Sequence, residues 1–171
     1  MDPLVIVPLV IVVALFFDFT NGFHDTANAM ATPIATGAMK PKTAVALAAV
    51  MNLIGAFLST EVSLTISKGI LNDDPKDGGA LLPPVIIFAA LTGAILWNLI
   101  TWLAGLPSSS SHALFGGLIG AAVASAGFGA VHFDKVMEKV LIPALFAPLI
   151  AGAAAALATL TAYVITGRSD A

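Results

Sequence analysis

Long apolar segments recur along this chain from end to end and are separated only by short polar connections. Of its 171 residues, 58% are hydrophobic and 10% are charged, whereas a soluble domain has roughly 25% charged residues. No segment is polar enough to form a water-soluble domain. We therefore expect an all-α integral membrane protein in which residues 1–171 form a single transmembrane domain.

The lengths of the apolar segments set the expected topology, because a bilayer core takes about 20 helical residues. The segments cover residues 4–39, 43–67, 81–104, 113–129 and 141–165. The first is too long for one straight span, and we expect it to be interrupted at Gly22 or Pro33. We expect about four or five transmembrane helices with broken or re-entrant half-helices. Residues 105–129 form a serine-tipped hairpin, residues 68–80 a polar loop, and residues 132–139 a short charged connection.

Charge and composition exclude several classes of protein. The net charge of −3 and the lack of a basic run argue against nucleic acid binding. The chain has no cysteine, which excludes disulfides, thiolate metal sites and a cysteine nucleophile. No Lys or Arg precedes the first apolar segment, so we interpret it as a retained span rather than a cleaved signal peptide. Lys40 and Lys42 favour a cytoplasmic position for the end of that segment.

A polar stripe in the first apolar segment is the strongest functional signal. Its members recur at intervals of three, four, three and four residues, so they share one face of a helix. They are Asp18, Asn21, Asp25, Asn28 and Thr32. A charged group turned toward hydrocarbon costs at least ~2.5 kcal/mol, so the stripe must face protein or a wet cavity. Its oxygens suit Na⁺, Mg²⁺ or Ca²⁺, or a proton. Residues 18–32 are therefore a candidate cation-side motif.

The second polar motif is Pro107 followed by four serines, Ser108, Ser109, Ser110 and Ser111, and then His112. Proline ends the preceding helix and serine caps the next, which predicts a helix N-terminus with unpaired N–H groups and hydroxyls. That arrangement is an anion site. Neither motif contains Lys or Arg, so a co-bound cation would supply the countercharge. We expect His112 to hydrogen-bond the serines, and Asn98 to lie near the site as a helix-contact residue.

Both motifs also have simpler structural interpretations. Serines before a helix are often an ordinary cap and turn, and a buried aspartate often pairs with a polar neighbour. A serine, a histidine and an aspartate are also the residue types of an acyl-transfer triad. However, the sequence has no Gly-x-Ser-x-Gly elbow, and successive serines offer no single strained nucleophile. We therefore expect that the protein is not an enzyme.

Residues 21–29 and 105–113 closely resemble the two signature segments of the inorganic phosphate transporter (PiT) family. The resemblance implies a secondary transporter of two inverted repeats, in which phosphate lies between two hairpin tips beside cation ligands. It assigns Ser108–Ser111 to phosphate. It assigns Asp25 and Asn28 to the cation side, where the expected metal is Na⁺ or none. The polar stripe adds Asp18, Asn21 and Thr32 as further candidates for the cation or proton. The pair Phe23-His24 resembles the bacterial, low-affinity branch, which implies a multi-pass protein of the bacterial inner membrane.

Each signature segment occurs once here, whereas a complete family member carries both twice. We therefore interpret the chain as one repeat, roughly the N-terminal half. It would be a fragment or a subunit completed by a second repeat or another subunit, rather than an antiparallel homodimer. The expected function is symport of inorganic phosphate with H⁺ or Na⁺. The phosphate would be carried as the free anion or as a complex with a divalent metal. No resident cofactor is expected. The alternatives are a sulfate permease of similar build and a non-transporting assembly partner.

The resemblance also yields a prediction for His24, because histidine is the side chain whose charge changes near neutral pH. If His24 takes part in proton coupling, His24→Gln should flatten the pH dependence of phosphate uptake. Uptake of labelled phosphate across a pH series measures this. A variant with the same pH dependence as the unchanged protein would contradict the assignment.

Overall fold

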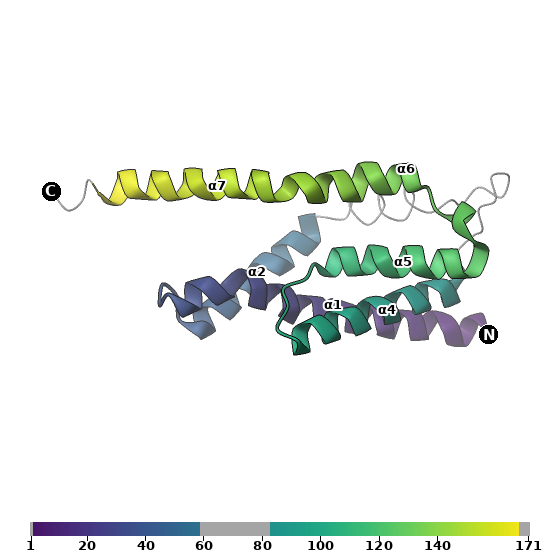
Figure 1. Ribbon diagram of the computed structural model, residues 1–171. Helices are drawn as coiled ribbons and strands as arrows, with labels where there is room; N and C mark the ends of the chain where they lie inside the picture. Colours follow the sequence, from purple (N-terminus) through teal and green to yellow (C-terminus); the bar gives the residue numbers. More distant parts are fainter. Residues whose placement is uncertain (1, 59–82, 168–171) are drawn as a thin grey trace. The chain divides into compact units, whose positions relative to one another are not determined.

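The structure, a computed structural model, describes residues 2–58 and 83–167 (Figure 1). The predicted polar loop at residues 68–80 lies outside the described residues. The regular elements are α1 (Pro3–Ala35), α2 (Pro41–Leu58), α4 (Pro84–Leu103), α5 (Ser110–Ala126), the 3₁₀ turn η2 (Phe128–Ala130), α6 (Phe133–Val136), the π-helical turn η3 (Met137–Leu141) and α7 (Ile142–Thr166). All of these are helical, which confirms the all-α prediction for the described residues.

The helices separate into two units, one up to His132 and one from Phe133 onward. Within the described residues, three helical stretches are long and apolar enough to cross a membrane: Pro3–Ala35, Pro84–Leu103 and Phe133–Thr166. Two further apolar helices, Pro41–Phe57 and Ser110–Ala126, are shorter. These lengths and compositions support the prediction of an integral membrane protein.

Helix α1 is continuous over 33 residues, so the predicted interruption of the first apolar segment is wrong. The helix passes through both expected break points, Gly22 and Pro33. Pro33 lies in the last turn, and the helix ends at Ala35 just after it. There the proline removes only one hydrogen bond near the helix end. Gly22 lowers helix propensity by only about 1 kcal/mol, which tertiary packing offsets.

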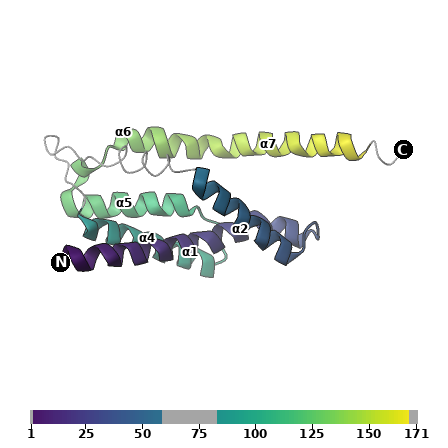
Figure 2. The same cartoon turned by 180° about the vertical axis from the view of Figure 1, so that it is seen from behind.

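Helices α4 and α5 form an antiparallel hairpin joined by residues 104–109, and Figures 1 and 2 show them side by side. After α4 the chain turns at Gly105, whose φ of +66° lies in the left-handed region that favours glycine. The side chain of Ser109 then caps α5 by accepting a hydrogen bond from the N–H of His112. The predicted serine-capped helix N-terminus after Pro107 is therefore confirmed.

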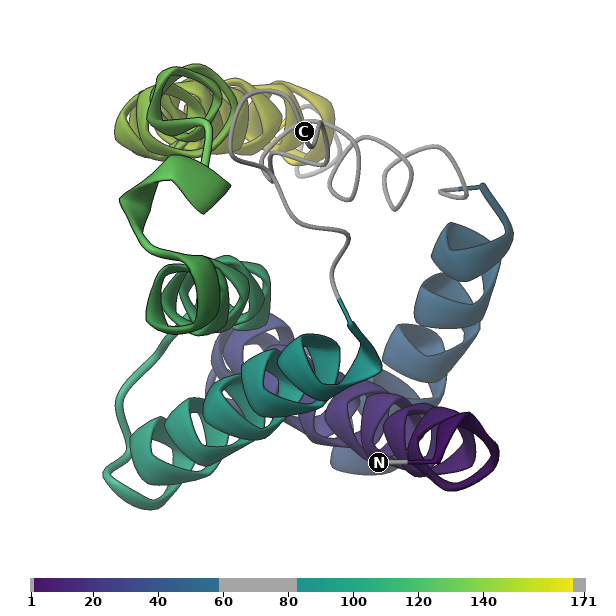
Figure 3. The same ribbon diagram turned by 90° about the vertical axis from the view of Figure 1, so that its right-hand side faces the viewer.

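Helix α1 packs against α4 in the same unit (Figure 3). Phe17 of α1 shares an apolar cluster with Leu91, Ala94 and Ile95 of α4. Further along both helices, His24 of α1 approaches Thr101 of α4. The two helices therefore advance in the same direction, and their apolar contact gives way to polar contact toward the end of α4.

In the second unit, α6, η3 and α7 follow one another without a break. The predicted charged connection at residues 132–139 is wrong from Phe133 onward, because these residues are helical. Lys135 and Glu138, three residues apart, pair at 3.1 Å on the same helical face. The π-helical turn ends at Leu141, two residues before Pro143. Proline donates no N–H to the ladder, which explains a local shift of hydrogen bonding at this point.

A close approach of α4 and α5 at Gly117 yields a prediction about stability. A Cβ atom added at Gly117 of α5 would overlap the main-chain oxygen of Ala90 in α4, whereas one added at Gly116 would meet nothing within 4 Å. Gly117→Ala should therefore destabilise the protein by about 1–3 kcal/mol. Thermal unfolding in detergent, followed by circular dichroism, measures this against Gly116→Ala. Equal midpoints for the two variants would contradict it.

Candidate functional site

The four serines Ser108–Ser111, here called the serine loop, lie against the polar stripe of α1. The hydroxyl of Ser110 donates to Oδ1 of Asp25 at 3.2 Å. The side-chain Nδ2 of Asn28 donates to the main-chain oxygen of Ser108 at 3.4 Å. These contacts join residues 85 and 80 positions apart in the chain. The two polar motifs singled out in the sequence thus meet in one place.

His24 lies beneath this contact and is only 3% exposed. Its Nδ1 faces Nδ2 of Asn28 at 3.3 Å, and its Nε2 faces the hydroxyl of Thr101 at 3.4 Å. Nδ1 is also 3.8 Å from Oδ1 of Asp25, whose side chain is 51% exposed. The buried imidazole therefore connects α1 with α4, and the half-exposed carboxylate beside it remains accessible.

The serines of the loop have different surroundings. Ser110 is buried and bonds Asp25. Ser108 approaches the Thr101 hydroxyl, with 3.1 Å between the two oxygens. Ser109 lies 2.8 Å from Nδ1 of His112, so that histidine is a hydrogen-bonding neighbour of the loop. Ser111 is exposed. The N-terminus of α5 thus presents N–H groups and serine hydroxyls to one region, the chemistry that binds an oxyanion.

The remaining predicted residues lie outside this polar contact. Asp18 and Thr32 are exposed, and within the described part of the chain neither side chain bonds the serine loop. Asn21 and Asn98 are placed one helical turn before His24 and Thr101, respectively. Asn98 is 1% exposed, and neither its Oδ1 nor its Nδ2 has a hydrogen-bond partner among the described residues; the same holds for Oδ1 of Asn21.

Two cavities with separate linings border the polar contact. One of about 460 Å³ is lined by His24 and Asn28 together with the start of the serine hairpin at residues 105–107. Another of about 500 Å³ is lined by Ser109 and His112 together with residues of α4 and α5. Both cavities therefore reach polar side chains that the sequence marked as candidates.

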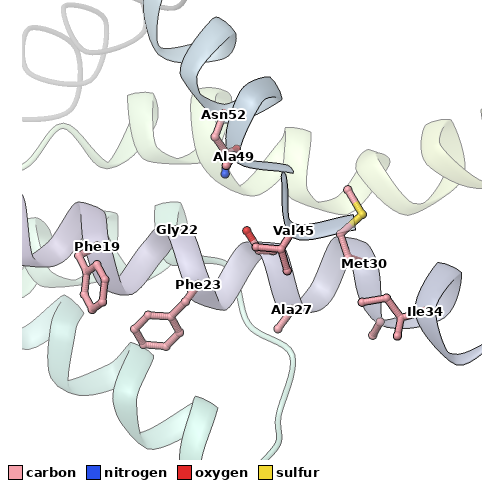
Figure 4. Close-up of a pocket in the computed structure, with 11 residues that line it drawn as sticks. Phe19, Gly22, Phe23, Ala27, Met30, Ile34, Val45, Ala49 and Asn52 are labelled. Atoms are coloured by element: carbon pink, nitrogen blue, oxygen red, sulfur yellow. The ribbon is translucent and has the colours of Figure 1, made fainter. Parts of the chain in front are cut away.

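A larger cavity of about 680 Å³ lies between α1 and α2 (Figure 4). Its lining is almost wholly apolar and includes Phe19, Phe23, Met30 and Val45. Thr26 and Asn52 are its polar side chains. An apolar lining offers an anion too few hydrogen-bond donors to replace its water. This cavity is therefore a poor candidate for the anion site despite its size.

No cluster of three or more His, Asp or Glu side chains suited to a metal ion occurs within residues 2–58 and 83–167. Asp25 and Asn28 lie one helical turn apart on α1, and each also contacts the serine loop. Because Nδ2 of Asn28 is the atom that donates, its Oδ1 is left free to act as a ligand. Together the two side chains offer hard oxygens, the donor type that Na⁺ accepts.

Thr101 is the contact residue that sequence reasoning missed. It lies three residues after Asn98 and seven before Ser108, so it shares a helix face with Asn98. That spacing was the available signal. A lone threonine in an apolar helix commonly bonds the carbonyl one turn earlier, as Thr92 does with Phe88 at 2.8 Å. The spacing to Asn98 and Ser108 distinguishes Thr101 from Thr92, but only the packing shows that Thr101 contacts His24 and Ser108.

A family profile and the similar proteins found by sequence comparison all point to one family. The sequence profile of the phosphate transporter family matches residues 21–171. The "Probable low-affinity inorganic phosphate transporter" of Mycobacterium bovis is 53% identical over 158 residues, covering 92% of this chain and 36% of that protein. The protein of the same name in Bacillus subtilis is 51% identical over 152 residues, with 88% and 44% covered.

The "Low-affinity inorganic phosphate transporter PitA" of Escherichia coli is 43% identical over 122 residues, covering 69% of this chain and 24% of that protein. No solved structure matches the chain. The chain spans about a third of the length of the mycobacterial relatives it matches, 36% in the first case. Because the family profile covers most of the sequence, from Asn21 to the end, this chain belongs to the phosphate transporter family.

Proposed function

We propose that this chain takes part in the uptake of inorganic phosphate by secondary transport, coupled to H⁺ or Na⁺. The observation that carries the proposal is the hydrogen bond between Ser110 and Asp25, which joins the candidate anion loop to the candidate cation stripe. An anion and a cation bound at adjacent positions neutralise each other, so each raises the affinity for the other. Mutual stabilisation of this kind is the basis of coupled transport.

In this proposal phosphate binds at the N-terminus of α5. The free N–H groups and the positive end of the helix dipole attract its oxygens, and the serine loop, Ser108–Ser111, adds hydroxyl groups. Support comes from the cap at Ser109, which fixes the start of the helix directly after the loop. His112 steadies that cap through its contact with Ser109.

The co-transported cation binds on the α1 side. Asp25 and Asn28 supply the oxygens, and the half-exposed carboxylate of Asp25 supplies the negative charge. Asp18, Asn21 and Thr32 lie on the same stripe and are proposed to line the route to this position rather than to touch the serine loop. A divalent metal carried together with phosphate would use the same oxygens.

Transport itself requires more than the described residues. We propose that the chain is one of two inverted repeats in the inner membrane of a bacterium, and that residues 105–129 form the hairpin whose tip carries the anion. A second repeat or another subunit then supplies the opposite wall of the site. The greater length of the relatives supports this view, since the chain spans 36% of the M. bovis protein and 44% of the B. subtilis protein.

The test expresses the natural gene encoding this chain in a bacterial strain that lacks its own phosphate transporters. We expect saturable uptake of labelled phosphate that falls when Na⁺ is replaced by choline, or that changes between two pH values. Sulfate uptake in place of phosphate would favour the permease alternative. Uptake of neither anion would leave only the assembly-partner interpretation. Phosphate transport by the purified 171-residue chain alone in liposomes would overturn the half-transporter proposal.

A second prediction concerns the charge of Asp25. Asp25→Asn keeps the shape of the side chain but removes the negative charge that binds the cation, so phosphate uptake should fall by roughly tenfold or more. The thermal midpoint of the purified protein should change little. The matched control is Asp134→Asn, which removes an exposed carboxylate from α6. Uptake by Asp25→Asn at the level of this control would refute the assignment.

A further inference from the structure

Thr101 is held at the junction of α1, α4 and the serine loop. Its side chain is 4% exposed. Its hydroxyl lies 3.1 Å from the hydroxyl of Ser108 and 3.4 Å from Nε2 of His24. Its own main-chain oxygen accepts the N–H of Leu106 at 2.8 Å. The same residue therefore contacts the segment leading into the serine loop through its backbone and the loop itself through its side chain.

The donors and acceptors of Asn28 and His24 determine which group donates to Thr101. Nδ2 of Asn28 is a donor only, so the Nδ1 of His24 that faces it accepts, and the neutral ring carries its hydrogen on Nε2. Nε2 therefore donates to the Thr101 hydroxyl oxygen. The single Thr101 hydrogen has the main-chain oxygen of Trp97 at 2.9 Å as its nearest acceptor. The second lone pair of the Thr101 oxygen is then available to the Ser108 hydroxyl.

This arrangement gives Thr101 a different role from an ordinary helix threonine. With Thr101 in place, the Ser108 side chain is tied to the end of α4 and the His24 N–H is satisfied. Without the hydroxyl, both lose a partner in a buried region, and the loop keeps only its backbone link to α4. An unpaired buried donor is costly, so the loop would rearrange to find another partner.

We propose that Thr101 is a positioning residue for phosphate: it orients Ser108 and His24 so that the serine loop holds its anion-binding conformation. The inference rests on the proposed function. It assigns no contact between Thr101 and the anion, because the threonine acts through Ser108 and is itself enclosed.

The experiment compares three variants of the natural gene in the phosphate-uptake assay. Thr101→Val keeps the side-chain shape but removes the hydroxyl, and Thr101→Ser keeps the hydroxyl. Thr92→Val is the matched control, because Thr92 lies on the same helix and bonds only the carbonyl of Phe88 among the described residues. We expect Thr101→Val to raise the KM for phosphate roughly tenfold with a maximal rate changed less than about twofold. Thr101→Ser and Thr92→Val should keep the original KM.

A second measurement does not depend on transport. The chain has no cysteine, so Leu106→Cys, at an exposed position before the loop, introduces a single thiol that a maleimide can label. Labelling in detergent should be faster when Leu106→Cys is combined with Thr101→Val than when it is combined with Thr92→Val. This rate reports the mobility of the segment that leads into the loop.

The outcomes separate this inference from the function on which it rests. If the unchanged protein takes up no phosphate, the proposed function fails, and faster labelling would still establish that Thr101 holds the loop. If uptake occurs and Thr101→Val leaves the KM unchanged, the positioning role is wrong, whatever the labelling rate. A raised KM that Thr101→Ser does not restore would also overturn it, because the hydroxyl would then not be the responsible group.

Discussion

Polar contact between the serine loop and α1 is the interaction on which the site depends. In an apolar chain, a buried polar group without a partner costs several kcal/mol, so contact between polar side chains is favourable. The bond to Asp25 meets this need for the buried hydroxyl of Ser110, and Asn28 adds a more exposed bond to Ser108. They also bring the end of one helix and the start of another together. The same contacts that satisfy the polar groups therefore place a helix N-terminus beside a carboxylate.

The rest of the first unit supports this meeting point. The apolar cluster around Phe17 and Ala94 sets α1 against α4. The turn at Gly105 then reverses the chain, so that α5 begins beside the same segment of α1. Apolar packing fixes the positions of α1 and α4, and the polar contacts form beyond the end of the apolar cluster. This division explains how a chain with 10% charged residues gathers so many polar groups at one point.

The sequence was sufficient for the helical class, for most helix positions and for the capped start of α5, because hydropathy and cap chemistry are local. It misled at α1, where Pro33 falls in the last turn and so interrupts nothing. It also misled at residues 133–139, where the pair of Lys135 and Glu138 belongs to a helix rather than a connection. The contact between Thr101 and His24 could not be predicted, because it joins residues 77 positions apart in the chain. Whether the predicted residues bind phosphate and a cation stays a prediction.

The fit of Gly117 against Ala90 has a mechanical consequence. Two helix backbones in such close contact pack tightly, because a move toward each other produces overlap and a move apart loses the van der Waals contact. The links from the loop to α1 are instead hydrogen bonds of 3.2 and 3.4 Å to Asp25 and from Asn28, two exposed residues at which water can replace the lost partner. The contact of the serine loop with α1 is therefore easier to separate than the contact between α4 and α5. If α4 moved relative to α1, the serine loop and α5 would move with it as one rigid unit.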